Sequence, residues 1–186
     1  MRKEIHFVSA EEAVKVVKSG DHIHLSSVAS APRILIDALC KRGEAGELQD
    51  VRIHHLHTEG PAPYADPKFE GIFFHQAFFV GANVRKSVQS GYSDYIPVFL
   101  SETQKLYRCG ALRCDVAMIQ VCPPDKHGYV SLGTVLSGRD ILGVLVNSWG
   151  SATGAFSLAM GSGNMLYIIG TPNAKVNDLG VKVLYR

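Results

Sequence analysis

The sequence has 186 residues, of which 46% are hydrophobic and 19% charged, and this length and composition suit one globular domain of ordinary size. The formal net charge of +2 and the scattered basic residues argue against nucleic acid or an anionic membrane as a partner. The charged N-terminus lacks the apolar core of a secretory signal, so we expect a cytoplasmic protein. We expect reduced thiols rather than disulfides or zinc ligands at the four cysteines, which form no Cys-x-x-Cys pair: Cys40, Cys109, Cys114 and Cys122.

The beginning of the chain predicts a helix followed by a β-α-β unit. Ser9-Ala-Glu-Glu12 is typical of a capping box, and apolar residues follow it at helical spacing until a Ser-Gly pair ends the run. The run 21–26 alternates like a strand, and Pro32 suits the first turn of a helix that ends at Gly43–Gly46. A further strand is expected over 51–56. Because strand, helix and strand follow one another, a parallel sheet is the default arrangement.

The chain up to residue 134 continues this alternation of strands and helices. The expected elements are, in order, an ordered loop without regular structure over 58–68, a strand over 71–80, a short helix over 84–89, an extended segment over 95–100, a capped helix from 101 to about 109, and strands over 116–121 and 129–132. The arrangement predicts an α/β fold with a mostly parallel sheet flanked by helices.

The segment 114–134 carries the predicted central strand and the loop that follows it. Asp115 precedes an apolar run that is rich in β-branched residues, and a Pro-Pro-Asp sequence ends the run. In open α/β sheets, ligands collect beyond the carboxyl ends of the strands, so the loop 122–128 is a candidate wall of a binding site. The alternative is a core strand followed by a tight turn.

The character of the sequence changes after Thr134. Only six of the 36 charged residues lie in the last 52 positions, and the glycine-rich run 141–170 carries none. Polar residues interrupt every short apolar run there, which argues against a transmembrane helix. We therefore divide the chain into a domain over 1–134 and an atypical tail over 135–186. We expect the sheet to be built before residue 135 and the uncharged run to add at most irregular or peripheral structure.

Two loops at strand-to-helix junctions are candidate substrate-binding sites. Ser26, Ser27 and Ser30 lie in a loop of small residues where a strand ends and a helix begins. The exposed N–H groups at such a helix end can bind an anion, such as a carboxylate or thioester oxygen. Gly81 and Asn83 repeat this arrangement after a later strand. The alternative is an ordinary turn, because the sequence contains neither Gly-x-Gly-x-x-Gly nor a Walker lysine.

The histidines allow a metal-binding interpretation, which we regard as the weaker one. His55 and His57 are expected to project from the same face of a strand, with Glu59 nearby, but no further cluster of ligands is visible. A strip of packed or hydrogen-bonded histidines is the better interpretation, and we predict no metal site. His127 could titrate near neutral pH and act as an acid or base, although no nucleophile is evident beside it.

Several separated motifs resemble the N-terminal half of the acetyl-CoA hydrolase/transferase family, which includes acetate and 4-hydroxybutyrate CoA-transferases. The motifs occur in the family's order over residues 1–134, and the sequence departs from the family after that point. They are Ser9-Ala-Glu-Glu-Ala-Val, Phe79-Val-Gly81, Gly91-Tyr-Ser-Asp-Tyr-Ile-Pro97 and Pro123-Pro-Asp-Lys-His-Gly-Tyr-Val-Ser-Leu-Gly133. The resemblance implies the CoA-transferase α/β fold, in which two related domains face each other across the active site.

The resemblance also implies an activity. CoA would move between an acyl-CoA, such as acetyl-, butyryl- or 4-hydroxybutyryl-CoA, and a short-chain carboxylate such as acetate, through a glutamyl-CoA thioester. In the family, the glutamate and the CoA-binding glycines belong to the second half, so no catalytic residue is assigned here. The loops Ser26–Ser30 and Gly81–Asn83 would line the acyl and carboxylate side of the cleft.

Coenzyme A would be a substrate rather than a permanently bound cofactor. The expected partners are the acyl-CoA and the carboxylate, together with further copies of the chain in a homo-oligomer or a complementary C-terminal half. We expect the isolated chain to be inactive. An acetyl-CoA hydrolase remains open as an alternative, because nothing in the residues separates water from a carboxylate as the acceptor. So does a non-catalytic fragment or subunit that only binds a partner.

Overall fold

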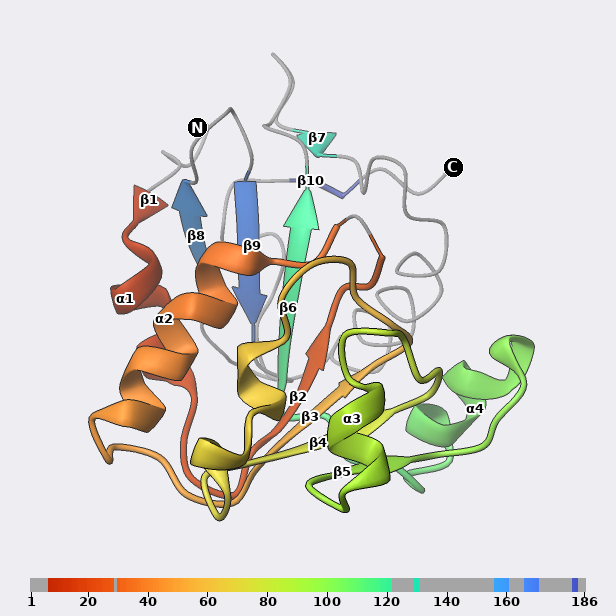
Figure 1. Cartoon of the computed structure of the whole chain (residues 1–186). Coiled ribbons are helices and arrows are strands. Elements are labelled where there is room, and N and C mark those ends of the chain that lie inside the picture. The colour runs from red at the N-terminus through yellow and green to blue at the C-terminus, as the bar shows by residue number, and fades with distance from the viewer. Residues whose placement is uncertain are drawn as a thin grey trace.

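The computed structural model describes residues 7–28, 30–121, 129–130, 156–160, 166–170 and 182–183. Its centre is a set of five parallel strands in the spatial order β6-β2-β3-β4-β5 (Figure 1). This confirms the predicted α/β fold with a mostly parallel sheet. The strands span β2 His22–Leu25, β3 Val51–His55, β4 Phe73–Ala77, β5 Ser93–Tyr95 and β6 Val116–Val121.

The strand order reverses at β2. The chain first moves outward from β2 through β3 and β4 to β5, and then returns to place β6 on the other side of β2. The register is continuous across this point, since Ile23 pairs with Ile53 on β3 and with Val116 on β6. In open α/β sheets, the carboxyl ends of the strands at such a reversal frame a ligand crevice.

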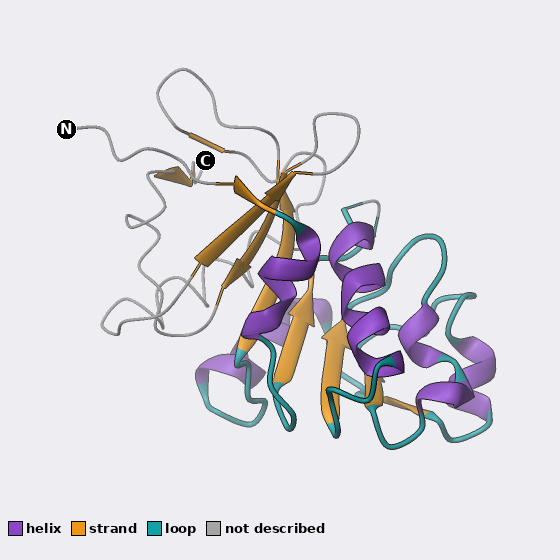
Figure 2. Cartoon of the chain, turned by 90° about the vertical axis from the view of Figure 1, so that its left-hand side faces the viewer, coloured by secondary structure: helices purple, strands orange, loops and turns teal. Residues whose placement is uncertain are grey.

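Three α-helices connect these strands. They are α2 Arg33–Glu44, α3 Arg85–Gln89 and α4 Thr103–Arg108. Helix α2 lies beside the N-terminal helix α1 Ala10–Ala13 and against the sheet (Figures 1 and 2), and it buries Leu35 and Leu39 completely. Gly43 allows a close approach to β4, because a Cβ at this position would lie 2.8 Å from the Phe73 ring. No described helix is long and apolar enough to cross a membrane.

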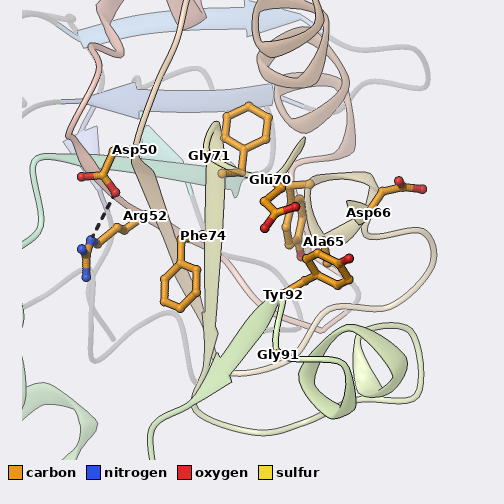
Figure 3. A pocket seen from close by; sticks show the side chains of 11 residues that line it. Asp50, Arg52, Ala65, Asp66, Glu70, Gly71, Phe74, Gly91 and Tyr92 are labelled. Atoms are coloured by element: carbon orange, nitrogen blue, oxygen red, sulfur yellow. Dashed lines mark ion pairs between the residues drawn. The ribbon is translucent and has the colours of Figure 1, made fainter. Parts of the chain in front are cut away.

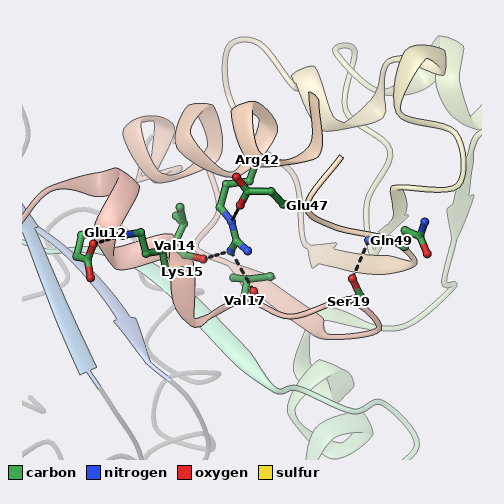
Figure 4. Close-up of polar contacts among 8 residues, drawn as sticks. All are labelled: Glu12, Val14, Lys15, Val17, Ser19, Arg42, Glu47 and Gln49. Carbon is green, nitrogen blue, oxygen red and sulfur yellow. Dashed lines mark hydrogen bonds and ion pairs between the residues drawn. The ribbon is translucent and has the colours of Figure 1, made fainter. Parts of the chain in front are cut away.

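The N-terminal helix forms as its capping box predicts. Helix α1 Ala10–Ala13 continues into the 3₁₀ helix η1 Val14–Val16, and the Ser9 hydroxyl accepts a hydrogen bond from the Glu12 N–H at 3.1 Å. Arg42 of α2 ties this segment to the domain (Figure 4). Its guanidinium donates to the carbonyl oxygens of Val14 at 2.6 Å and Val17 at 3.0 Å. The Arg42 side chain therefore supplies hydrogen bonds to carbonyl oxygens at the C-terminal end of η1.

Two of the predicted elements differ in the structure. The segment expected to be an irregular loop over 58–68 contains two short 3₁₀ helices, η2 Pro63–Ala65 and η3 Pro67–Phe69, each begun by a proline. Proline suits the first position of a helix because its fixed φ is already helical. The extended segment expected over 95–100 ends at Tyr95, and η4 Leu100–Glu102 follows, so Ser101 lies inside a 3₁₀ turn and does not cap α4.

The expectation that residues 141–170 add only irregular or peripheral structure was wrong. Strand β9 Leu166–Gly170 pairs antiparallel with β6, and β8 Phe156–Met160 pairs with β9 and with β1 Phe7–Val8. An uncharged strand is what the middle of a sheet requires, and its register comes from partners distant in sequence. Outside this sheet, β7 Tyr129–Val130 pairs with β10 Lys182–Val183, and the rest of the strand predicted over 129–132 lies outside the described residues.

Candidate functional site

Three loops meet at the carboxyl ends of β2, β3 and β4, which we call the carboxyl edge. The loop after β2 pairs with the loop after β3 through a parallel bridge between Val28 and Thr58. In this bridge the Val28 N–H donates to the His57 carbonyl at 2.7 Å. The predicted residues Ser26, Ser27 and Ser30 lie in the first loop, and Gly81 and Asn83 follow β4. The fold therefore places both predicted loops at the edge where the strand order reverses.

The Ser26 and Ser27 hydroxyls are engaged within the chain. The Ser26 Oγ donates to the Ser30 carbonyl at 2.5 Å and accepts from the Gln120 N–H of β6 at 3.2 Å. The Ser27 Oγ accepts from the Leu56 N–H at 3.1 Å. All three serines are buried, with at most 6% exposed. In this arrangement Ser26 and Ser27 fix the backbone of the loop between β6 and β3, and their role toward a substrate stays a prediction.

Asn83 joins the loop after β4 to the loop after β3. Its side-chain amide donates to the Thr58 carbonyl and to the Gly60 carbonyl, each at 2.9 Å, and lies 3.1 Å from the Thr58 hydroxyl oxygen. Gly81 accommodates this side chain, because a Cβ there would lie 2.8 Å from the Asn83 Oδ1. Asn83 therefore holds the segment that follows β3 by hydrogen bonds, and Gly81 leaves room for the Asn83 side chain.

Val28 has a φ of +56°, in the left-handed region that β-branched residues rarely adopt. Such a conformation costs about 1–3 kcal/mol and persists where surrounding contacts impose it. Here the contacts are the bridge to Thr58 and the hydrogen bond from the Glu59 N–H to the Val28 carbonyl at 3.2 Å. Backbone strain is common at functional sites, and no pattern in the sequence indicates it at this position.

The carboxyl edge also presents a carboxylate and an apolar groove. The Glu59 Oε1 lies 3.8 Å from the His57 Nε2, and both side chains reach solvent. A groove of about 230 Å³ lies next to them, and its lining is mainly apolar: Leu56, His57, Phe78, Phe79, Val98 and Leu100. The sequence suggested Glu59 only as a possible metal ligand, and the groove was not predicted. The available signal was the pair of aromatic residues shortly before Gly81.

The histidines of the strands are packed rings on both faces of the sheet. On one face, His24 and His54 contact Tyr107 of α4. On the other, His55 stacks on His75 with ring centroids 4.4 Å apart, and its Nε2 lies 2.8 Å from the Tyr64 hydroxyl. No group of three possible metal ligands occurs in the described part of the chain. The expected same-face pair of His55 and His57 does not form, because β3 ends at His55.

Burial holds these histidines in the neutral form. It lowers the pKa of His24 and His75 to about 3, with a smaller contribution from the neighbouring His54. The pKa of His54 falls to about 4 for the same main reason, although its hydrogen bond to Gln76 opposes the change. The pKa of His55 lies well below its usual value because of burial and the adjacent His75. These rings are therefore poor proton acceptors near neutral pH.

The described cysteines are Cys40, Cys109 and Cys114, and all are free thiols. Burial raises the pKa of Cys40 to about 12 and also raises that of Cys114. A thiol with a raised pKa is a weak nucleophile at neutral pH, so the structure offers no support for a catalytic role of these two residues. Cys122, the predicted site wall 122–128 and His127 lie outside the described residues.

This open α/β domain with small-residue loops at the carboxyl edge is a fold that the chain shares with part of a solved CoA-transferase. The chain matches the family model of the acetyl-CoA hydrolase/transferase N-terminal domain over residues 2–142. It therefore belongs to the acetyl-CoA hydrolase/transferase family, as the sequence motifs indicated. The match extends eight residues beyond the predicted boundary at 134, and the division of the chain at that boundary stays a prediction.

Characterised relatives and solved structures resemble the chain. A succinyl-CoA:acetate/propanoyl-CoA:succinate CoA transferase from Fasciola hepatica is 40% identical over 125 residues, which are 67% of this chain and 26% of that protein. The 4-hydroxybutyrate coenzyme A transferase of Clostridium kluyveri is 35% identical over 126 residues, 68% of this chain and 29% of that protein. The crystal structure of RipA from Yersinia pestis superimposes with a TM-score of 0.64 and 26% identity, covering 73% of this chain and 33% of RipA. A 4-hydroxybutyrate CoA-transferase from Porphyromonas gingivalis gives a TM-score of 0.52 at 25% identity, over 68% and 27% of the two chains. The chain thus spans about a third or less of the length of these relatives.

Proposed function

We propose that this chain acts as the N-terminal domain in the transfer of CoA between an acyl-CoA and a short-chain carboxylate. The match to the family's N-terminal domain over residues 2–142 carries this proposal. The activities named for two relatives support the class of reaction, since both are CoA transferases that act on short acyl groups. Coenzyme A is then a substrate, and the reaction needs no resident cofactor. A cytoplasmic location forms part of the same proposal.

We propose that the carboxyl edge forms the acyl and carboxylate side of the cleft, and two features of its geometry support this. The groove beside Phe79 is apolar enough to take a short acyl chain. Beside it, Asn83 holds the loop after β3, and Ser26 and Ser27 hold the loop after β2. These contacts fix the loops before substrate arrives, which lowers the entropy cost of positioning the reacting groups.

The covalent step belongs, in this proposal, to a glutamate of a second domain. Its carboxylate would become joined to CoA as a glutamyl-CoA thioester while the acyl group leaves as its free carboxylate. The acceptor carboxylate then takes the CoA and restores the glutamate. Glu59 is the carboxylate of the carboxyl edge, among the described residues, that could form such a thioester in place of a glutamate from the second domain. We assign it no catalytic role.

Two other functions have specific support. Hydrolysis of acetyl-CoA requires only that water replace the acceptor carboxylate, and the matched family carries both activities in its name. A partner-binding role is favoured by the large apolar side chains exposed at and beside the carboxyl edge, which are Phe79, Tyr95, Phe99 and Leu100. Exposed apolar surface of this kind commonly marks association, so we propose that the chain forms a homo-oligomer or binds a complementary C-terminal half.

An exchange assay separates these functions. The purified chain is incubated with acetyl-CoA and isotopically labelled acetate, first alone and then with the separately expressed C-terminal part of the Clostridium kluyveri relative. We expect no label exchange with the chain alone, exchange with the mixture, and a glutamyl-CoA adduct on the added part by mass spectrometry. Thioester loss without exchange would indicate a hydrolase. A CoA adduct on Glu59 or another glutamate of this chain would contradict the assignment of the nucleophile.

Light scattering addresses the partner-binding role directly. We expect the apparent mass of the chain to rise with concentration, or to rise when the C-terminal part of the relative is added. Replacing the exposed residues Phe99 and Leu100 by serine should reduce this association. A monomer at every concentration, with and without the added part, would count against both the complex and the homo-oligomer.

A further inference from the structure

A second pocket lies at the opposite end of the strands from the carboxyl edge, and we call it the amino-edge pocket (Figure 3). It has a volume of about 300 Å³ and is formed where β3, β4 and β5 begin. Its lining includes residues just before these strands, such as Asp50, Gly71 and Tyr92. The family resemblance assigns substrate to the other edge, so the amino-edge pocket is available for a different ligand.

The pocket lies where the start of β4 is not paired with β5. Strand β5 pairs with β4 only from His75 onward, where His75 lies opposite Ser93. The first two residues of β4, Phe73 and Phe74, therefore have no partner on that side among the described strands. Gly91 and Tyr92 lie across this gap, with Gly91 in the left-handed region at a φ of +82°. The pocket is thus shaped by the start of the short strand β5 rather than by loosely packed side chains.

Its walls combine aromatic rings with carboxylates. Phe74 and Tyr92 present ring faces and edges that suit an apolar body or a cation, because aromatic rings attract positive charge over their faces. Glu70 contributes an exposed carboxylate near Tyr92, and the exposed Asp66 lies at the rim with its carboxylate directed away from the rings (Figure 3). The Asp66 carboxylate accepts a hydrogen bond from the Lys68 N–H at 2.9 Å, and the Lys68 ammonium pairs with Glu44 at 2.7 Å. Glu70 is therefore the carboxylate that is better placed for a ligand.

The charge of the lining selects against an anion. Arg52 is the one basic side chain among the described residues that line the pocket. It lies 3.8 Å from the Asp50 carboxylate and over the Phe74 ring, with its Cζ 5.9 Å from the ring centroid. Arg52 is therefore already paired, and it also demonstrates that a guanidinium fits against this aromatic wall. The remaining carboxylates of Asp66 and Glu70 leave the pocket with an excess of negative charge.

We propose that the amino-edge pocket binds a small organic cation, a guanidinium or alkylammonium group carried on a short apolar body. The apolar body lies between Phe74 and Tyr92, and the cationic group faces Glu70. Because this carboxylate is exposed, binding is weak and decreases as the salt concentration rises. The same chemistry is found on free amines and on arginine or lysine side chains of a protein, and the experiment distinguishes these two sources.

The test is a titration of the full chain followed by ¹H–¹⁵N correlation spectra. Agmatine serves as the free cation and Nα-acetyl-argininamide as the peptide-borne guanidinium, while 1-pentanol and acetate are the neutral and anionic comparisons. The amide signals of Gly71 and Gly91 report on the pocket. We expect saturable shifts at both glycines with at least one guanidinium compound, and none with 1-pentanol or acetate.

Variants locate the site. We expect Glu70→Gln to weaken binding about threefold through loss of an exposed charge, and Tyr92→Leu to weaken it by a similar factor through loss of the aromatic face. Glu11→Gln, which removes another exposed carboxylate, from α1 and outside the pocket, should leave the affinity unchanged. The spectra themselves confirm that each variant is folded.

The outcomes separate the sources. Binding of agmatine alone would assign the pocket to a free small cation, and binding of Nα-acetyl-argininamide alone would assign it to a protein side chain. The absence of saturable shifts with both compounds would overturn the proposal. So would equal shifts with 1-pentanol, or an affinity that is the same in Glu70→Gln and in the unaltered chain.

Discussion

The serines of the carboxyl edge and the histidines in the middle of the strands are both removed from water, but they differ in their hydrogen bonds. Ser26 and Ser27 each place their hydroxyl against backbone groups of a neighbouring segment. His75 has no partner at either ring nitrogen among the described residues, and His55 has one only at Nε2.

This contrast indicates two ways of burying polar groups. The edge uses its hydroxyls and the Asn83 amide to hold loops in place, which is what a binding site needs. The strands pack their histidines as neutral rings against Tyr64 and Tyr107. Among the described residues, His24, His54 and His55 each have one hydrogen-bond partner for their two ring nitrogens. Substitution of individual hydrogen-bond donors should therefore destabilise the loops of the carboxyl edge, whereas a change of pH should act on stability through the histidine layers.

Acid gives the largest expected effect. A histidine in the unfolded chain titrates with its ordinary pKa of about 6.5, whereas His24 and His75 in the folded chain have a pKa of about 3 and His54 of about 4. The unfolded state thus binds more protons, so the stability is fully present above about pH 6.5 and falls as the pH decreases from there toward about 3. One pKa unit corresponds to about 1.4 kcal/mol, so the loss amounts to several kcal/mol. Urea unfolding at a series of pH values measures it.

A matched pair of variants assigns this loss to the buried rings. His75→Leu replaces a titrating ring by an apolar side chain, and we expect it to move the acid midpoint to lower pH. His57→Gln changes a histidine whose side chain is 27% exposed, and the midpoint should stay in place. If both variants unfolded at the same pH as the unaltered chain, the histidine layers would not set the acid response.

Arg42 gives the next largest effect because its guanidinium makes three contacts at one junction. Arg42→Ala leaves the carbonyl oxygens of Val14 and Val17 without their 2.6 and 3.0 Å contacts and removes the ion pair with Glu47. We expect about 2–3 kcal/mol of lost unfolding free energy. Lys15→Ala, which removes an exposed pair with Glu12 on the same segment, should cost less than about 1 kcal/mol. Similar losses in both variants would mean that the junction does not depend on these donors.

Tyr64→Phe removes the one hydrogen-bond partner that His55 has among the described residues and leaves both of its ring nitrogens unpaired there. The variant therefore tests whether a buried histidine needs a hydrogen bond, as the serines of the carboxyl edge do. The ring is kept, but His55 loses its 2.8 Å partner and the Thr58 hydroxyl loses a 3.3 Å contact. We expect a cost of about 1–2 kcal/mol in urea unfolding. Tyr92→Phe serves as the control and should change stability by less than about 0.5 kcal/mol, because that ring is partly exposed. No cost for Tyr64→Phe would show that His55 is indifferent to its hydrogen bond.

The parts of the molecule that the sequence predicted are those that depend on neighbouring residues. The Ser9 cap, the strand within the predicted run 21–26 and the helix that follows Pro32 are all set by residues within a few positions. The two candidate loops could be placed at one edge because parallel strands end on the same side. These are local rules combined with one general property of α/β sheets.

The remainder depends on contacts between distant residues. The Ser26 hydroxyl is occupied by the backbone of Gln120, which is 94 positions away, and no local pattern indicates this. The same holds for the stacking of His55 on His75 from an adjacent strand. The pairing of β9 with β6 was missed because glycine-rich, uncharged sequence fixes no register by itself and takes it from its partner.

Asn83 gives the smallest of these effects and the one closest to the candidate site. Asn83→Ala removes the donor to the Thr58 and Gly60 carbonyls. Gly60 is exposed and its carbonyl can bind water instead, so we expect a loss of about 1 kcal/mol. Asn83→Asp keeps the shape but directs a carboxylate oxygen at two carbonyl oxygens 2.9 Å away, and should cost at least as much as alanine. Hydrogen exchange at Thr58, Glu59 and Gly60 should accelerate in both variants, whereas Gln89→Ala on the exposed end of α3 should leave it unchanged. If Asn83→Asp matched the unaltered chain in stability and exchange, donation by the amide would not hold the loop. The carboxyl edge would then not depend on its side-chain donors, and the contrast with the histidine layers would not stand.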